Sequence, residues 1–237
     1  MLTRIDYRDG EAALIGWLAE PEGHGRVPGV LVAHEAPGVG PHVKDAAERL
    51  AAHGYVAFAL DLYGGEGFSV EESLERHREM MGTPGLMARR AAAGLAVLAA
   101  QPRVDAARLA AIGFCQGGIT ALELARAGAP ILAAIGFHPG LRRPAGSPDA
   151  PIRAKVLMMV GDADPVVTAE DRLTFARDMD AAGADWQLHL YGGVGHSFTN
   201  PEVDALGYPG FRYDARAERR AWASMLDLLG EVFGDRA

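Results

Sequence analysis

The chain has 237 residues, of which 49% are hydrophobic, and its formal net charge is -8. This length and apolar content suit one α/β domain with a sizeable core, which we expect to span residues 1–237. The acidic charge argues against a nucleic-acid surface, which is usually basic, and a single cysteine excludes an internal disulfide.

The sequence contains no recognisable export or membrane signal. The N-terminal stretch Met1–Asp6 lacks the apolar core of a signal peptide, and the Ala-rich run 91–100 is too short to span a bilayer. We therefore expect a cytoplasmic protein with a small-molecule partner and with neither a nucleic-acid nor a membrane partner. The oligomeric state stays open.

Short apolar runs bounded by glycine and proline alternate with helical segments along the chain. The runs predict strands over residues 13–18, 28–33, 55–60, 109–114, 131–137 and 156–160, and residues 186–191 are also strand-like. Helices are expected over residues 43–53, 71–81, 86–100, 119–126, 168–182 and 215–233. This alternation predicts an α/β fold with a mostly parallel central sheet and helices on both faces.

Local signals refine two of these boundaries. Thr168 followed by Asp171 resembles a capping box, and Gly183 is a suitable stop for the helix that it begins. The stretch 137–152 contains four prolines and is expected to be a surface loop.

Polar residues follow several of the predicted strands, at the edge where open α/β sheets place their sites. They include His34, Glu35, Asp61, Cys115, Asp164 and His196. The topology alone therefore predicts that these side chains converge.

Cys115 lies at the centre of the sequence Gly113-Phe-Cys-Gln-Gly117, between a predicted strand and a predicted helix. This arrangement is typical of a nucleophile elbow, in which a sharp turn exposes the nucleophile. The flanking glycines remove the Cβ atoms that such a strained turn cannot accommodate. A lone buried cysteine usually packs as a small hydrophobe, but the spacing here favours a catalytic thiol.

Partners for a nucleophile follow later strands. His196 lies in the glycine-rich loop 192–196 and could act as the general base or as the imidazolium partner of a thiolate. Asp162 and Asp164 compete for the role of orienting His196, and we favour Asp164 because a Gly-x-x-Asp turn recurs for this acid in hydrolases. Asp162 is explained by turn chemistry. The order nucleophile, acid, histidine is that of the α/β-hydrolase fold.

Glu35 and the other histidines have weaker claims. A carboxylate near Cys115 would disfavour the thiolate, so Glu35 is expected to support a neutral resting thiol. His34 and His138 follow strands and have supporting roles at best. His77 lies on a charged predicted helix and is expected to be solvated.

These motifs together resemble the dienelactone hydrolase family (carboxymethylenebutenolidases), over nearly the whole chain. The resemblance rests on a cysteine in the elbow, Glu35 in His-Glu-x-x-Gly, and the sequence Gly195-His-Ser-Phe198. It implies Cys115 as nucleophile, Asp164 as acid, His196 as base and Glu35 as the carboxylate that contacts the resting thiol. It further implies an oxyanion hole formed by the backbone amides of Ala36 and Gln116, and a pocket bordered by residues 61–64 with Tyr63.

The chain departs from the family at one position. Well-known members carry an arginine four residues after the catalytic histidine, where this chain has Asn200, which supplies no charge. Phe198 and Asn200 are expected in the pocket wall. Arg76, Arg78 or Arg212 could supply a cation instead.

The sequence therefore predicts a cysteine-dependent hydrolase of a small ester or lactone, acting through an acyl-enzyme on Cys115. It implies neither a metal nor another cofactor. A general carboxylesterase or thioesterase without lactone preference is the nearest alternative. A non-catalytic protein of the same fold that uses Cys115 as a redox sensor is a more distant one.

Overall fold

The computed structural model describes residues 1–234, so residues 235–237 of the expected domain lie outside the described part. Its strands are β1 (Leu2–Asp9), β2 (Ala12–Ala19), β3 (Val27–Ala33), β4 (Val56–Leu60), β5 (Val104–Phe114), β6 (Ala133–Phe137), β7 (Lys155–Gly161) and β8 (Trp186–Tyr191). Its helices are α1 (Pro41–Ala52), α2 (Val70–Gly82), α3 (Leu86–Ala99), α4 (Gln116–Arg126), α5 (Ala169–Ala181), the short 3₁₀ helix η1 (Pro201–Leu206) and α6 (Ala215–Phe233).

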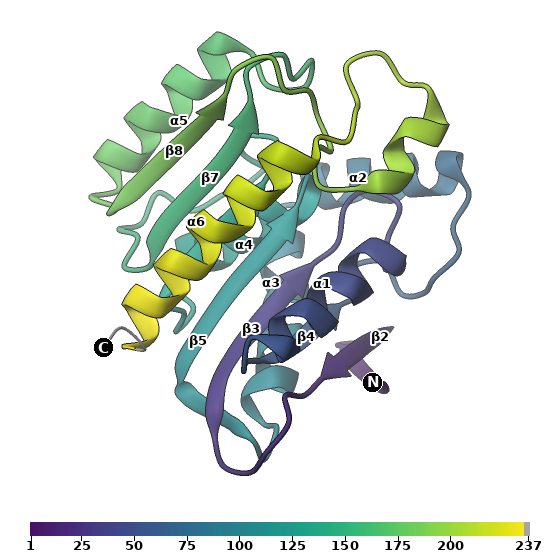
Figure 1. Ribbon diagram of the computed structural model, residues 1–237, viewed down its shortest axis with the longest axis vertical. Helices are drawn as coiled ribbons and strands as arrows, with labels where there is room; N and C mark the ends of the chain where they lie inside the picture. The colour runs from purple at the N-terminus through teal and green to yellow at the C-terminus, as the bar shows by residue number, and fades with distance from the viewer. Residues whose placement is uncertain (235–237) are drawn as a thin grey trace.

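The strands form one sheet in the order β1-β2-β4-β3-β5-β6-β7-β8 (Figure 1). The pairs β1–β2 and β2–β4 are antiparallel, whereas every pairing from β4 through β8 is parallel. The prediction of an α/β-hydrolase fold with a mostly parallel sheet is therefore confirmed.

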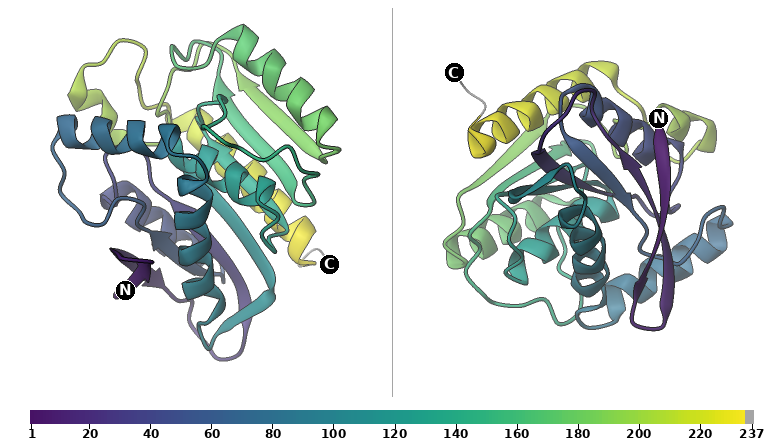
Figure 2. Two further views of the ribbon diagram at one scale, coloured as in Figure 1. Left: turned by 180° about the vertical axis from the view of Figure 1, so that it is seen from behind. Right: turned by 90° about the horizontal axis from the view of Figure 1, so that it is seen from below.

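Two hydrophobic clusters pack on the opposite faces of the sheet. Helices α1 and α6 lie on one face of the sheet and α2, α3, α4 and α5 on the other (Figure 2), and each set contributes side chains to the cluster on its face. Alternate strand residues divide between them: Leu31 and Phe58 enter the second cluster, while Val32 and Ala57 enter the first. Both faces of the parallel strands are covered, as their continuous apolar runs predict.

Several element boundaries differ from the expected ones. Strand β1 was not predicted, because it mixes charged and apolar residues at the sheet edge and buries only one of them. Strand β5 begins at Val104 instead of Leu109, with a register shift opposite Pro28 and Gly29. Strand β6 begins two residues late, at Ala133, and α4 begins at Gln116, directly after the elbow cysteine.

The predicted signals at the two ends of α5 are confirmed. Thr168 and Asp171 form a full capping box at the start of α5, and Gly183 follows α5 with a φ of 63°. Residues 138–152 form no helix or strand, as their prolines predict. Within residues 1–234, no helix is both long and apolar enough to cross a membrane.

Candidate active site

Cys115 occupies the sharp turn between β5 and α4. Its backbone lies at φ 50° and ψ -114°, a strained conformation for a residue with a side chain. The Cys115 amide donates a hydrogen bond to the carbonyl of Phe137 on neighbouring β6 (2.9 Å). The turn is thus held by its neighbours, and the thiol is half-buried at its tip.

The glycines of the elbow have the steric role that their spacing predicts. A Cβ on Gly113 would lie 2.1 Å from the backbone of Gly117, and a Cβ on Gly117 would lie 2.1 Å from the carbonyl oxygen of Ala33. Helix α4 therefore approaches both β5 and β3 more closely than any side chain allows.

Gly117→Ala is expected to destabilise the fold, because the added methyl meets backbone atoms that cannot rotate away. We expect a loss of about 1–3 kcal/mol in the free energy of unfolding, measured by denaturant titration. Gly82→Ala is the matched control, since a Cβ at that position meets no atom within 4 Å. Equal stability of the two variants would contradict the close approach of α4 to β3.

His196 and Asp164 meet at the ends of β8 and β7. The Oδ2 atom of Asp164 lies 2.7 Å from Nδ1 of His196, and both residues are buried. The loop segment 210–212 fixes the backbone of His196 through hydrogen bonds in both directions. Asp162 instead has a half-exposed side chain that pairs with Arg172 at 3.5 Å, so it does not contact His196.

The electrostatics of His196 depend on Cys115. Burial lowers the pKa of His196, but the charge of Cys115 and the hydrogen bond to Asp164 outweigh burial and raise this pKa to about 10. Nε2 of His196 has no other hydrogen-bond partner among residues 1–234. The His196 ring is therefore in electrostatic contact with the elbow thiol.

The two backbone amides of the predicted oxyanion hole have no acceptor. Among the described residues, the N–H groups of Ala36 and Gln116 donate no hydrogen bond. Gln116 begins α4 directly after Cys115, and Ala36 lies in the loop after β3. Such free donors suit an oxyanion that develops next to a nucleophile.

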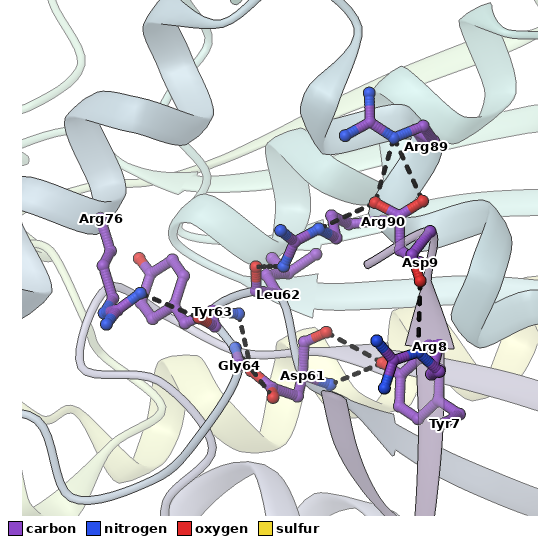
Figure 3. Close-up of polar contacts among 11 residues, drawn as sticks. Tyr7, Arg8, Asp9, Asp61, Leu62, Tyr63, Gly64, Arg76, Arg89 and Arg90 are labelled. Carbon is purple, nitrogen blue, oxygen red and sulfur yellow. Dashed lines mark hydrogen bonds and ion pairs between the residues drawn. The ribbon is translucent and has the colours of Figure 1, made fainter. Parts of the chain in front are cut away.

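Tyr63 lies beside the elbow because a buried aspartate orders its loop. Asp61 accepts hydrogen bonds from the backbone amides of Tyr63, Gly64 and Gly65, while Arg76 donates to the Tyr63 carbonyl (Figure 3). The Tyr63 hydroxyl then donates to Oε1 of Gln116 at 2.9 Å.

Gln116 also contacts Nδ1 of His77 from α2. The expectation that His77 is solvated is therefore wrong, because this ring turns inward and is half-buried. Helical spacing could not reveal this contact, which joins residues 39 positions apart.

Phe198 does not line an open pocket. Its ring has no exposed surface and packs edge-on against His138 and Tyr191 in the core. We therefore correct its expected place in the pocket wall: it supports the loop that carries His196.

Asn200 and Glu35 contact each other. Nδ2 of Asn200 donates to Oε1 of Glu35 at 2.6 Å, and Oδ1 of Asn200 caps η1. A cavity of about 220 Å³ between α1 and η1 reaches both side chains, but neither Cys115 nor His196 lines it. Glu35 forms no hydrogen bond with Cys115 in the described chain; its partners are Asn200 and His42.

The three arginines that could bind a substrate carboxylate lie in different surroundings. Arg76 stacks over Phe68 at 4.3 Å and is held by the Tyr63 carbonyl, so it lies in the loop that borders the elbow. Arg78 and Arg212 are exposed. Among the three, only Arg76 is joined to a residue that contacts Gln116.

A family model described as the dienelactone hydrolase family matches residues 14–233. The chain belongs to the dienelactone hydrolase family. Family membership makes the protein a hydrolase of the ester- and lactone-cleaving class. The motifs that carry the resemblance therefore identified the family correctly.

Relatives of this dienelactone hydrolase family protein include both enzymes and a solved structure. A carboxymethylenebutenolidase of Pseudomonas sp. is 31% identical, over 86% of this chain and 85% of its own. A Bradyrhizobium protein described as a probable 2-oxo-3-(5-oxofuran-2-ylidene)propanoate lactonase is 30% identical, over 95% and 92%. The crystal structure of a dienelactone hydrolase-like promiscuous phosphotriesterase from metagenomic libraries is 40% identical, with a TM-score of 0.93 over 98% of both chains.

Proposed function

We propose that the protein is a cysteine-dependent hydrolase of small esters or lactones and that Cys115 forms an acyl-enzyme. The observation that carries this proposal is the alignment of Asp164, His196 and the elbow thiol, with Asp164 2.7 Å from His196 and Cys115 raising the pKa of His196. A nucleophile, a base in electrostatic contact and a third group that orients the base are the parts that acyl transfer needs.

The first step is attack by the Cys115 thiolate on the substrate carbonyl carbon. A C–S bond forms, and the negative charge on the carbonyl oxygen is stabilised by the amides of Ala36 and Gln116. When the tetrahedral intermediate collapses, the C–O bond to the leaving group breaks and the His196 imidazolium donates its proton to that oxygen. In a lactone the leaving hydroxyl stays attached to the acyl group.

The second step is hydrolysis of the thioester. Neutral His196 takes a proton from water, the resulting hydroxide attacks the thioester carbon, and the C–S bond breaks. The products are a carboxylic acid and the restored thiolate–imidazolium pair. Asp164 holds His196 with its Nδ1–H toward the carboxylate, so that Nε2 faces the reaction in both steps.

Titration of His196 tests the ion pair directly. In the wild type the imidazolium should persist until the pH rises through about 10, and Cys115→Ala should lower this pKa because the neighbouring negative charge is lost. Since the folded pKa of His196 is raised above its usual 6.5, the charged ring stabilises the fold below that pH, and this contribution is lost as the pH rises through about 10. NMR of ¹⁵N-labelled histidine measures both values. Identical pKa values in the two proteins would contradict the pair.

Asn200 determines which substrate charge we expect the protein to prefer. Because Asn200 has no charge and its donor is engaged by Glu35, wild-type protein should prefer carboxylate-bearing lactones over neutral esters of similar size less strongly than family members with arginine at this position. Asn200→Arg should raise the anionic-to-neutral ratio of kcat/KM by roughly tenfold, the value of one charge-assisted hydrogen bond.

Asn200→Met is the matched control, with added length and no charge. A strong anionic preference in the wild type that Asn200→Arg leaves unchanged would show that another cation binds the carboxylate. Arg76 would then be the first position to replace, since it is linked to the elbow through Tyr63.

A phosphotriesterase activity is a second candidate, favoured by the relative of that description at 40% identity. In that reaction the same thiolate attacks phosphorus, so that a P–S bond forms while the P–O bond to an aryloxide breaks. Water then hydrolyses the P–S bond. A panel of aryl esters, thioesters, lactones and aryl dialkyl phosphates, assayed with and without thiol blocking, separates these activities. Turnover that survives thiol blocking would contradict the cysteine mechanism. No turnover of any panel member would favour the redox-sensor alternative.

A further inference from the structure

A buried polar chain lies behind His196 and takes no part in the steps above. His42 Nδ1 lies 3.2 Å from Glu35 Oε1, and His42 Nε2 lies 3.3 Å from the Thr199 hydroxyl. The same hydroxyl lies 2.7 Å from Nε2 of His138. Four residues from three separate loops and α1 are thus joined in one line.

The ionisation of Glu35 decides which group donates and which accepts in this line of hydrogen bonds. Asn200 and His42 both direct donors at its carboxylate, and burial, which raises the pKa of Glu35, is outweighed by these hydrogen bonds and by the charge of His196. The pKa of Glu35 is therefore lowered, and the ionised carboxylate can only accept. His42 must carry a proton on Nδ1, which leaves Nε2 as an acceptor when the ring is neutral.

With His42 neutral, the remaining links follow. The Thr199 hydroxyl has one proton, which it donates to His42 Nε2, so its oxygen must accept from His138. His138 therefore carries its proton on Nε2. Its Nδ1 is buried, and no other described residue offers it a hydrogen-bond partner, so a proton on Nδ1 could reach only the backbone of His138 itself.

His138 is the ring that flanks His196. The two ring centroids are 5.3 Å apart in an edge-to-face arrangement, and His138 is fully buried with a φ of 40°. Burial lowers the pKa of His138, and the charge of the adjacent His196 lowers it further. Two adjacent imidazoles would otherwise compete for one proton.

We propose that Glu35 is a positioning residue that acts through His42 and Thr199 to hold His138 neutral, with its proton on Nε2, against the ring of His196. Only His196 of this pair then takes up the proton that the reaction needs. The proposal rests on the proposed role of His196 for its catalytic meaning, but the tautomer assignment stands without it.

The first test is the ¹⁵N ring chemical shifts of His42 and His138 in the full chain, which distinguish the two tautomers and the cation. We expect neutral His42 protonated on Nδ1 and neutral His138 protonated on Nε2. If His42 is charged, its Nε2–H donates to the Thr199 oxygen. The Thr199 hydroxyl then donates to Nε2 of His138, whose own proton lies on Nδ1. Either of those observations would overturn the proposal.

Thr199→Val tests the link itself, because it removes the hydroxyl and keeps the shape. His138 should then populate both tautomers and kcat should fall several-fold with KM unchanged, whereas Thr199→Ser should restore the wild-type shifts and rate. Unchanged His138 shifts in Thr199→Val would overturn the proposal. If Thr199→Val does not fold, the comparison of Thr199→Ser with Thr199→Ala provides the same contrast.

Glu35→Gln tests the charge at the far end. The groups that face His196 are Cys115, Asp164, His138 and, at longer range, Glu35. Loss of the Glu35 charge should shift the alkaline pKa of the kcat/KM profile to lower pH, because a negative charge that favours the His196 imidazolium is removed. Glu202→Gln is the matched control. Glu202 lines the same cavity as Glu35 and is exposed, but it takes no part in the line of hydrogen bonds from Glu35 to His138.

An equal shift in the two variants would overturn a specific role for Glu35. Failure of the proposed function has a different signature: wild-type protein would show no turnover at any pH, while the histidine tautomers would remain as assigned.

Discussion

Cys115→Ala is expected to abolish ester hydrolysis, with a loss of at least about a thousandfold in kcat/KM, because no other group can form the acyl-enzyme at the elbow. The fold should persist, since alanine is smaller than cysteine and the strained turn is held by the hydrogen bond to Phe137. Steady-state kinetics on a chromogenic ester, together with a thermal melt, measure both effects.

The result is informative only for a folded protein, so the melting curve is the control. Cys115→Ser provides a second one, because it keeps a potential nucleophile of similar size. Wild-type turnover by folded Cys115→Ala would show that another residue is the nucleophile. Ser197, adjacent to His196, would then be the residue to replace.

Asp164→Asn is expected to lower kcat by about 10³–10⁴-fold, because an amide can stabilise the wrong tautomer of His196 and carries no charge to support the imidazolium. Asp162→Asn is the matched control two residues away. Its side chain is half exposed and pairs with Arg172, so its effect should stay within about twofold.

The comparison of these two variants separates orientation from general charge. Both substitutions remove one negative charge from the same turn, and only Asp164 contacts His196. A larger loss in Asp162→Asn than in Asp164→Asn would contradict the assignment of the orienting carboxylate.

The buried parallel strands were predictable because each is a short apolar run between turn residues, as in 28–33 and 55–60. Strand β1 was not, since an edge strand exposes most of its side chains and its charges disguise the alternation. The extra residues of β5 also escaped prediction, because a register shift opposite β3 depends on the partner strand.

In the candidate site, too, features within one turn were predictable from the sequence, whereas contacts between distant residues were not. Gly113, Cys115 and Gly117 could be interpreted together because their steric role lies within one turn. The contact of His77 with Gln116 and the line from Glu35 to His138 could not, since they join residues far apart in sequence. Nothing in the local pattern around His42 or Thr199 distinguishes them from ordinary loop and helix residues.

The most direct test of the account is mass spectrometry of the protein quenched in acid during turnover of an activated ester. The account predicts a mass increase equal to the acyl group, located on the peptide that contains Cys115 and absent from Cys115→Ala. Rapid turnover without any adduct on Cys115, or an adduct on another residue, would contradict it.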